Sequence, residues 1–426
     1  MSDDNENACG LVRRIRLEEL VIPSTGFWGR DQPSADAREF LVLGVGNVTN
    51  EGELDLKGAT KRYLTRGEMG GVAEEGDLVV VKSSGSAANI RSGKTAICPA
   101  ELSGKIACSN FMMRLKVKRD VADPYLLWLI LNSQAAKTFI REIVGASTYP
   151  NIKWENYRRF EFELPRLEKQ RRIAAQLREQ LSILAEARTA LESQLNAAES
   201  LPAAHLRAVF DTTESESWPK RTIGEMIHEG VLSEHQDGNH GELHPRNKDF
   251  IIEGVKFVTA KHISGDGTVL LRLAPCISKE QASGLRIGFA RANDVLLAHN
   301  ATVGKVGIAP PECEPFVVGT SLTIYRANAE MVDPKFLFYT LTASQFQRQL
   351  VDAMKQTTRN QVPITKQRTL SLPMPAVDAQ HDISAQLDDA FAVSVGLRNS
   401  LRAKLSELEK LPAALLRAAF QPSNQD

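Results

Sequence analysis

The chain has 426 residues, of which 42% are hydrophobic and 24% are charged, and its formal net charge is zero. This length predicts two to three domains, and the composition is that of a globular protein rather than a disordered or fibrous one. A neutral chain has no overall basic field, so any attraction to nucleic acid must come from local patches. No apolar run approaches the roughly 18 residues that a transmembrane helix needs.

The start of the chain and its cysteines predict a cytoplasmic protein with no membrane partner. Residues 1–7 are acidic and polar, without the basic and apolar stretches of a secretory signal. The five cysteines are odd in number and scattered, which fits a reducing compartment better than a disulfide framework. They also form no CxxC pair of the kind that structural zinc sites use.

The chain repeats itself at a shift of 210 residues. Gln170–Phe210 aligns with Gln380–Phe420 without a gap, and 17 of the 41 positions are identical. Upstream the repeat is weaker, but the Asp-Pro pairs that begin at Asp123 and Asp333 are also 210 residues apart. Repeats of this kind indicate duplicated structural units. We therefore expect two copies of one unit, each a variable block followed by a helical block.

The variable blocks, residues 11–163 and 218–371, are expected to be mixed α/β. Short β-type runs lie between Gly, Asn and Asp turn signals in both blocks, at Phe40–Leu43, Leu78–Val81, Phe257–Thr259 and Asp294–Leu297. One longer helix pattern follows each Asp-Pro pair. Residues 211–217 are acidic and rich in Ser and Thr, which predicts a linker.

In both helical blocks the seam positions recur with steps of four and three, the heptad pattern of a coiled coil. The predicted seam comprises Leu177, Leu181, Leu184, Leu191, Leu195, Leu387, Phe391, Leu401, Leu405 and Leu408. Arg188 and Arg398 share one seam position, where they either reach solvent or set the register. Pro202 and Pro412 lie late in the blocks and predict a kink or a helix restart.

Antiparallel packing of the two helices within one chain is the simplest arrangement, and it would make the molecule pseudo-twofold symmetric. The alternatives are that each helix covers its own domain or pairs with another chain.

Two segments of the neutral chain are locally basic. Between Asp77 and Asp120 a single acid accompanies eight bases, and between Asp352 and Asp378 there is no acid. Such segments can neutralise phosphates, although a charge run is more often a solvated face. Interleaved polar side chains can contact phosphates or base edges. The candidate DNA-binding residues are Lys82, Ser83, Arg91, Lys94, Lys105, Asn151, Lys153, Lys261, His299, Asn300, Lys305, Thr358, Arg359, Asn360, Gln361 and Lys366.

No catalytic or metal-binding residue is predicted. Ser92–Thr95 has the end of a phosphate-binding loop, but Ala88 stands where the first glycine is required. The histidines between His228 and His244 lie in a polar stretch without cysteines and are expected to be exposed loop residues. The motifs HExxH, GxSxG, Glu-x-Lys and Asn/Asp-Pro-Pro-aromatic do not occur. The pattern favours a recognition subunit over an enzyme.

With these motifs the chain resembles the specificity (S) subunit of Type I restriction–modification enzymes over nearly its whole length. The resemblance rests on the Leu-Pro…Gln-x-x-Ile helix starts at Leu164–Ile173 and Leu372–Ile383, the run from Asp294 to Gly307, and the Leu-Arg-Ala-x-Phe helix ends. In the first block, Ala87–Lys94 departs from that run. In the second helix start, His381-Asp382 stands where basic residues are usual in the family.

The resemblance implies two mixed α/β target-recognition domains, residues 1–163 and 211–371 with the linker, joined by long antiparallel spacer helices at residues 164–210 and 372–426. It implies a non-catalytic subunit whose two domains each read half of a split target in double-stranded DNA. The implied partners are two methyltransferase subunits and restriction/translocase subunits. S-adenosylmethionine, ATP and Mg²⁺ would bind to those partners, which would give a DNA adenine methyltransferase and an ATP-dependent endonuclease.

Two alternatives remain open at this point. One is a bipartite DNA-binding protein of another defence or regulatory assembly that does not methylate DNA. The other is a coiled-coil scaffold with no role on DNA.

Overall fold

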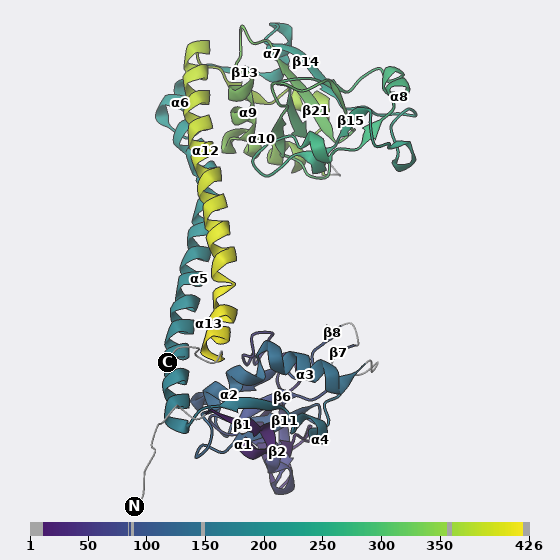
Figure 1. Ribbon diagram of the computed structural model, residues 1–426. Coiled ribbons are helices and arrows are strands. Elements are labelled where there is room, and N and C mark those ends of the chain that lie inside the picture. Colours follow the sequence, from purple (N-terminus) through teal and green to yellow (C-terminus); the bar gives the residue numbers. More distant parts are fainter. Residues whose placement is uncertain (1–11, 84, 87–88, 146–149, 356–359, 421–426) are drawn as a thin grey trace, which may run out of the picture. The chain divides into compact units, whose positions relative to one another are not determined.

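A computed structural model describes residues 12–83, 85–86, 89–145, 150–355 and 360–420 (Figure 1). The chain divides into two compact units, Met1–Thr189 with Ser406–Asp426 (unit 1) and Ala190–Leu405 (unit 2). Each unit combines strands with helices, which confirms the predicted mixed α/β class. Within the described residues, none of the helices combines the length and the apolar character that a membrane span requires.

Unit 1 is built on two four-stranded sheets. The first is antiparallel with the order β2-β11-β6-β9, formed by Val21–Thr25, Met112–Val117, Leu78–Val81 and Thr95–Ile97. The second has the order β4-β3-β10-β5, formed by Thr60–Thr65, Ala37–Leu43, Ile106–Cys108 and Val72–Ala73, and its strands β3 and β10 are parallel. Two small sheets complete the unit, β1-β12 (Arg13–Arg16, Glu161–Leu164) and β7-β8 (Gly85–Ser86, Asn89–Ile90).

Unit 2 repeats the order of both four-stranded sheets and of the β1-β12 pair. Its antiparallel sheet has the order β14-β21-β18-β19, formed by Leu232–Asp237, Leu322–Ala327, Val295–Ala298 and Val306–Ile308. Its second sheet has the order β16-β15-β20-β17, formed by Cys276–Ile277, Val255–Val258, Phe316–Val318 and Phe289–Ala290, with β15 and β20 parallel. The pair β13-β22 (Lys220–Thr222, Ser371–Pro373) is the counterpart of β1-β12.

Short helices surround the sheets in both units. In unit 1 they are α1 (Leu17–Leu20), α2 (Pro124–Leu131), α3 (Gln134–Val144), α4 (Trp154–Tyr157) and the 3₁₀ turns Val45–Asn47, Arg66–Gly71 and Ala100–Leu102. In unit 2 they are α6 (Thr213–Ser217), α7 (Ile223–His228), α8 (Lys279–Ser283), α9 (Pro334–Thr342), α10 (Ser344–Lys355), α11 (Ile364–Gln367) and the 3₁₀ turns Asn247–Asp249, Ala260–His262 and Leu271–Leu273. The single helix expected after each Asp-Pro pair is thus a pair of helices.

The central strands β6 and β18 are buried on both faces. Successive side chains of a strand point to opposite faces. Accordingly, Leu78 and Val80 belong to a core cluster with α2 and α3, whereas Val79 and Val81 belong to a separate cluster with the second sheet. The alternation recurs in β18, whose residues divide between two clusters in the same way. This double burial explains why both strands are continuous apolar runs in the sequence.

A duplicated glutamine ties each long helix to its block. Asp123 caps α2 by accepting the Leu126 N–H at 2.9 Å, and its own N–H donates to Gln170 Oε1 at 2.9 Å. In unit 2, the Asp333 N–H donates to Gln380 Oε1 at 3.1 Å. The two glutamines are 2% and 1% exposed. A buried polar side chain needs hydrogen-bond partners, and the glutamine amide finds one at the Asp-Pro turn. The repeated Gln-x-x-Ile motif therefore marks the attachment of each long helix to its block.

The long helices are α5 (Leu167–Phe210), α12 (Val377–Leu408) and α13 (Leu411–Phe420) (Figure 1). In unit 2, α5 and α12 run antiparallel: Glu199 contacts Arg402 at 3.0 Å, while the later Leu206 shares a core cluster with the earlier Leu387. In unit 1, Leu415 and Leu416 of α13 pack against the cluster that contains Leu177 of α5. The heptad residues are buried or half-buried in both helices; Arg188 is exposed and Arg398 is half-buried.

The two late prolines behave differently. Helix α5 continues through Pro202, so no restart occurs there. In the second repeat the helix breaks after Leu408 and restarts at Leu411. Pro412 is then in the first turn of α13, where the missing N–H costs no helical hydrogen bond. The expected linker also differs from the prediction, because residues 213–217 form helix α6, capped by the Thr212 hydroxyl through the Ser215 N–H at 3.1 Å.

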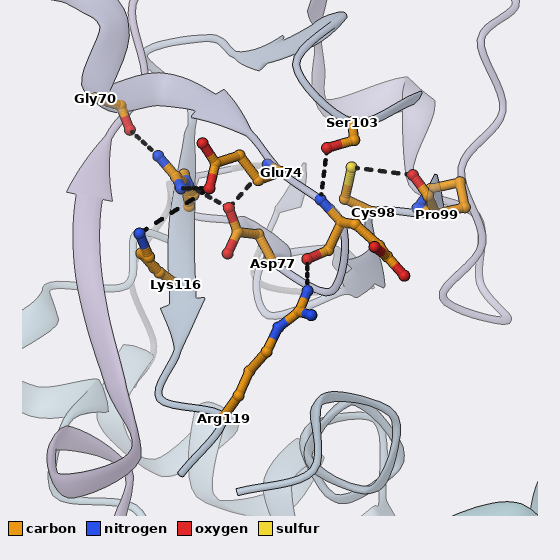
Figure 2. A network of polar contacts seen from close by, with 10 residues as sticks. Gly70, Glu74, Asp77, Cys98, Pro99, Ser103, Lys116 and Arg119 are labelled. Carbon is orange, nitrogen blue, oxygen red and sulfur yellow. Dashed lines mark hydrogen bonds and ion pairs between the residues drawn. The ribbon is translucent and has the colours of Figure 1, made fainter. Parts of the chain in front are cut away.

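A buried ion pair closes the turn before each central strand. In unit 1, Arg114 Nε donates to Asp77 Oδ2 at 2.6 Å, and the Glu74 N–H donates to the same carboxylate at 2.9 Å (Figure 2). In unit 2, Arg326 donates to both oxygens of Asp294, at 2.9 and 2.7 Å. The residue before each aspartate has a positive φ, 77° at Gly76 and 64° at Asn293. Glycine and asparagine are the residues that tolerate this conformation best.

Candidate nucleic-acid interface

Two loops meet at one end of the antiparallel sheet in unit 2. Residues 299–305 connect β18 to β19, and residues 360–363 precede α11. They are joined by a bridge between Asn300 and Gln361 and by two backbone hydrogen bonds, from the Val362 N–H to the His299 carbonyl at 2.9 Å and from the Ala301 N–H to the Asn360 carbonyl at 3.2 Å. Asn300 and Asn360 are exposed, and Gln361 is half-buried.

Unit 1 builds the same loop pair from different side chains. Ser83 forms a bridge with Asn151, and the Ile152 N–H donates to the Lys82 carbonyl at 2.8 Å. The hairpin closes as in unit 2: the Gly93 N–H donates to the Val81 carbonyl at 2.8 Å, and the Gly304 N–H donates to the Ala298 carbonyl at 2.9 Å. Both glycines have a φ of 93°. The sequence departure therefore falls in an equivalent hairpin whose connection, from β6 to β9, is longer than that from β18 to β19 and includes the pair β7-β8.

Most of the candidate DNA-binding residues in the described part of the chain belong to these loop pairs or flank them. Lys82, Ser83, Arg91, Lys94, Asn151 and Lys153 do so in unit 1, and His299, Asn300, Lys305, Asn360, Gln361 and Lys366 do so in unit 2. Lys261 lies in the turn whose Ala260 carbonyl accepts a hydrogen bond from Lys305 Nζ at 3.2 Å. Lys105 lies elsewhere, in the turn before β10 of the second sheet. Thr358 and Arg359 lie outside the described residues.

Positive charge at the unit 1 loop pair is partly desolvated. Burial lowers the pKa of the Lys94 ammonium, and the neighbouring charge of Arg91 lowers it further. A half-buried cation beside a second cation gains more from an anionic ligand than an isolated surface lysine does. The arrangement is therefore suited to phosphate contacts.

The unit 2 loops rest on a buried polar network that the sequence did not reveal. Gln367, at the end of α11, donates from Nε2 to Thr323 Oγ1 and to the Val362 carbonyl, both at 3.0 Å. Thr323 Oγ1 lies 2.9 Å from His299 Nδ1 and donates to Asp237 Oδ1 at 3.2 Å. The network thus connects the strands β14 and β21 to both loops. Because these residues are far apart in the chain, no local sequence motif predicts the network.

His299 supports its loop from inside. Only 8% of the residue is exposed, and burial lowers its pKa, an effect that the charge of Asp237, 4.0 Å away, opposes. The same positions are different in unit 1. By strand register Met113 replaces Thr323 and Thr25 replaces Asp237, while Tyr157 occupies the end of the short helix in place of Gln367. Equivalent loops are thus supported by different side chains in the two units.

The other histidines of unit 2 lie in different surroundings. Among the described residues there is no group of three or more His, Cys, Asp or Glu side chains that could hold a metal ion. His240 and His244 are paired through Nδ1 with the Gly238 and Asn239 carbonyls, at 3.0 and 2.9 Å. The expectation of exposed loop residues is wrong for His235, which lies on β14 against the Tyr325 ring. It is also wrong in part for His228, which is exposed but is the last residue of helix α7. Burial lowers the pKa of His235 to about 4.

Comparison with known proteins identifies the family of this chain. The family model described as "Type I restriction modification DNA specificity domain" matches residues 74–197 and 246–407. The chain is 25% identical over 175 residues to the Type I restriction enzyme EcoBI specificity subunit of Escherichia coli, an alignment that spans 41% of this chain and 36% of that protein. It is 21% identical over 360 residues to the MjaVIII specificity subunit of Methanocaldococcus jannaschii, spanning 80% of this chain and 77% of that protein.

Two solved structures share the fold. One is a chain from a structure that describes complex assembly and conformational transition of the type I R-M system, with a TM-score of 0.72, 21% identity, and coverage of 96% of this chain and 97% of that chain. The other is the HsdS subunit from Thermoanaerobacter tengcongensis, with a TM-score of 0.62, 21% identity and 97% coverage of both chains.

Proposed function

Since the chain belongs to the Type I restriction–modification DNA specificity family, we propose that it is the DNA-recognition subunit of such a complex and carries no catalysis of its own. Each unit contacts one half of a split site in double-stranded DNA through its loop pair. The observation that carries this proposal is the duplicated loop pair with different side chains, Ser83 and Asn151 in one unit and Asn300 and Gln361 in the other. The loop backbone, which the two units share, positions the protein on the duplex, while the amide and hydroxyl side chains of the loops read base edges.

The remaining chemistry is assigned to partners. Two methyltransferase subunits dock on the long helices, bind S-adenosylmethionine and methylate adenine. Restriction/translocase subunits supply ATP- and Mg²⁺-dependent cleavage. The complex acts in the cytoplasm, where its DNA substrate is found. The family of the chain, the resemblance of its helix motifs to specificity subunits and its two duplicated units support this proposal.

Methylome sequencing of a host with and without this gene tests the function directly. The expected result is a split motif with methylated adenine in each half, present only when the gene is expressed together with its methyltransferase subunits. An unchanged methylome, combined with binding of the chain to a specific duplex, would instead support a bipartite DNA-binding protein of another assembly. If the chain shows no preference for any duplex, the remaining interpretation is a coiled-coil scaffold with no role on DNA.

Replacing Lys366 with alanine should weaken DNA binding in a salt-dependent way. The residue lies on α11 beside the loop pair, and each phosphate contact removed should lower the slope of log affinity against log salt by about 0.9. The measurement is a salt titration of affinity for one duplex. The matched control is Lys279→Ala, which removes an exposed positive charge from α8 beside the second sheet. An unchanged slope for Lys366→Ala would show that the residue does not contact a phosphate.

A further inference from the structure

An exposed phenylalanine stands beside the unit 1 loop pair. Phe111 is the last residue of the turn between β10 and β11, and it is 49% exposed. Its carbonyl accepts hydrogen bonds from the Lys82 and Ser83 N–H groups, at 2.8 and 3.2 Å. These bonds fix Phe111 next to the bridge between Ser83 and Asn151. The aromatic ring thus shares an edge of the unit with the residues proposed to contact DNA.

The turn that carries Phe111 is held on several sides. The Met112 N–H donates to the Ser109 carbonyl at 3.0 Å, and the Ser109 N–H donates to the Leu43 carbonyl at 3.1 Å. The segment that follows β2 is attached just before this turn, because the Phe27 N–H donates to the carbonyl of Cys108, the last residue of β10, at 2.8 Å. The next two residues, Met112 and Met113, are buried in the core. A rigid turn therefore presents a large apolar side chain to solvent, where it adds little to the stability of the fold.

Unit 2 has a serine at the equivalent position. The Ser321 carbonyl accepts the His299 N–H at 3.0 Å, as the Phe111 carbonyl accepts the Lys82 N–H. The turn closes identically, with the Leu322 N–H donating to the Gly319 carbonyl at 3.1 Å. The backbone thus tolerates a small polar residue here. The aromatic side chain is a property of unit 1 and not a requirement of the turn.

We propose that Phe111 is an apolar wedge that packs against the base pairs of the half-site read by unit 1, an inference that rests on the proposed function. Proteins insert Phe, Leu or Ile between base steps to unstack and kink the duplex. Basic neighbours such as Lys82 and Lys153 hold the DNA backbone while the ring enters the stack. Ser321 cannot do this, so unit 2 reads its half-site without a wedge.

The test compares Phe111→Ser, which copies unit 2, with Ile22→Ser, which removes another exposed apolar residue from the opposite end of β2. The probe is the duplex that the full-length wild-type chain selects from random sequences, with 2-aminopurine placed at successive positions of both half-sites. Phe111→Ser should lower affinity by about tenfold or more, with an unchanged salt slope because no charge is lost. The wild-type chain and Ile22→Ser should raise 2-aminopurine fluorescence at a step in one half-site, and Phe111→Ser should not.

The outcomes separate the wedge from the proposed function. Wild-type affinity and a retained fluorescence rise in Phe111→Ser, with thermal unfolding like that of the wild type, would overturn the wedge and leave the recognition function intact. An equal loss in Ile22→Ser would show a general effect of surface apolar residues, and it would also overturn the wedge. Failure of the wild-type chain to select any duplex would remove the proposed function, and the wedge with it.

Discussion

Removing four residues from each of the paired helices should shorten the gap between the DNA half-sites by about two base pairs. The deletions are Leu195–Ala198 in α5 and Arg398–Leu401 in α12, which lie near the contact between Glu199 and Arg402. At about 1.5 Å per helical residue and about 3.4 Å per base pair, four residues correspond to roughly two base pairs. Four residues also shift the heptad seam by only half a residue, so the helices should remain paired.

The structural basis for this expectation is the continuity of α5. This helix has its first residues in unit 1 and its last residues in unit 2, with no break at Pro202. A change in its length must therefore be transmitted to the spacing of the two loop pairs if the helices act as a ruler. Selection of preferred sites from random duplexes measures the outcome, and unchanged half-sites with a shorter gap are expected.

A two-residue deletion provides the sharpest control. It would rotate the residues that follow by about 200°, which moves the seam to the solvent side and should abolish binding. Recovery of the original gap at full affinity after the four-residue deletions would show that the helices do not set the spacing.

Asp294→Ala should destabilise unit 2 by about 1.5–3 kcal/mol. The Asp294 side chain is 1% exposed and the Arg326 side chain 15% exposed, so the substitution removes two charge-assisted hydrogen bonds from a largely buried guanidinium, which keeps its contacts with Glu234 and the Phe289 carbonyl. The loss should be largest in unit 2, whose tryptophan is Trp218, whereas the other three tryptophans of the chain lie in unit 1. Urea unfolding followed by Trp218 fluorescence, in a background with the other three changed to Phe, measures the effect.

The double variant Asp294→Leu with Arg326→Met is the matched control. Replacing both members of a buried ion pair by apolar residues of similar size is often neutral or stabilising, so most of the lost stability should return. A loss below about 1 kcal/mol in Asp294→Ala, the size of a surface ion pair, would contradict a structural role for this pair.

The duplicated architecture could be predicted from the amino-acid sequence alone. The β-type runs at Leu78–Val81 and Asp294–Leu297 and the heptad spacing are local patterns, which depend only on neighbours along the chain. The 210-residue shift shows that these patterns occur twice. The buried Gln170 and Gln380 were visible as repeated letters, because each copy of the joint needs the same amide. The repeat does not predict that each glutamine binds the Asp-Pro turn 47 residues earlier in the chain.

The loops that come together at the candidate interface could be identified from the tertiary structure but not from the sequence. Ser83 meets Asn151, and Asn300 meets Gln361, across 68 and 61 residues that contain strands, turns and two helices. Such pairing follows from sheet register and from the packing of helices on the sheet, neither of which leaves a periodic signal. The longer hairpin loop of unit 1 also shifts the alignment locally. Gln367 supports the loops of unit 2, and Tyr157 is at the equivalent position of unit 1. This equivalence is apparent only when the strands of the two units are superimposed, because the residues that pack beneath the loops are close in space but far apart in the chain.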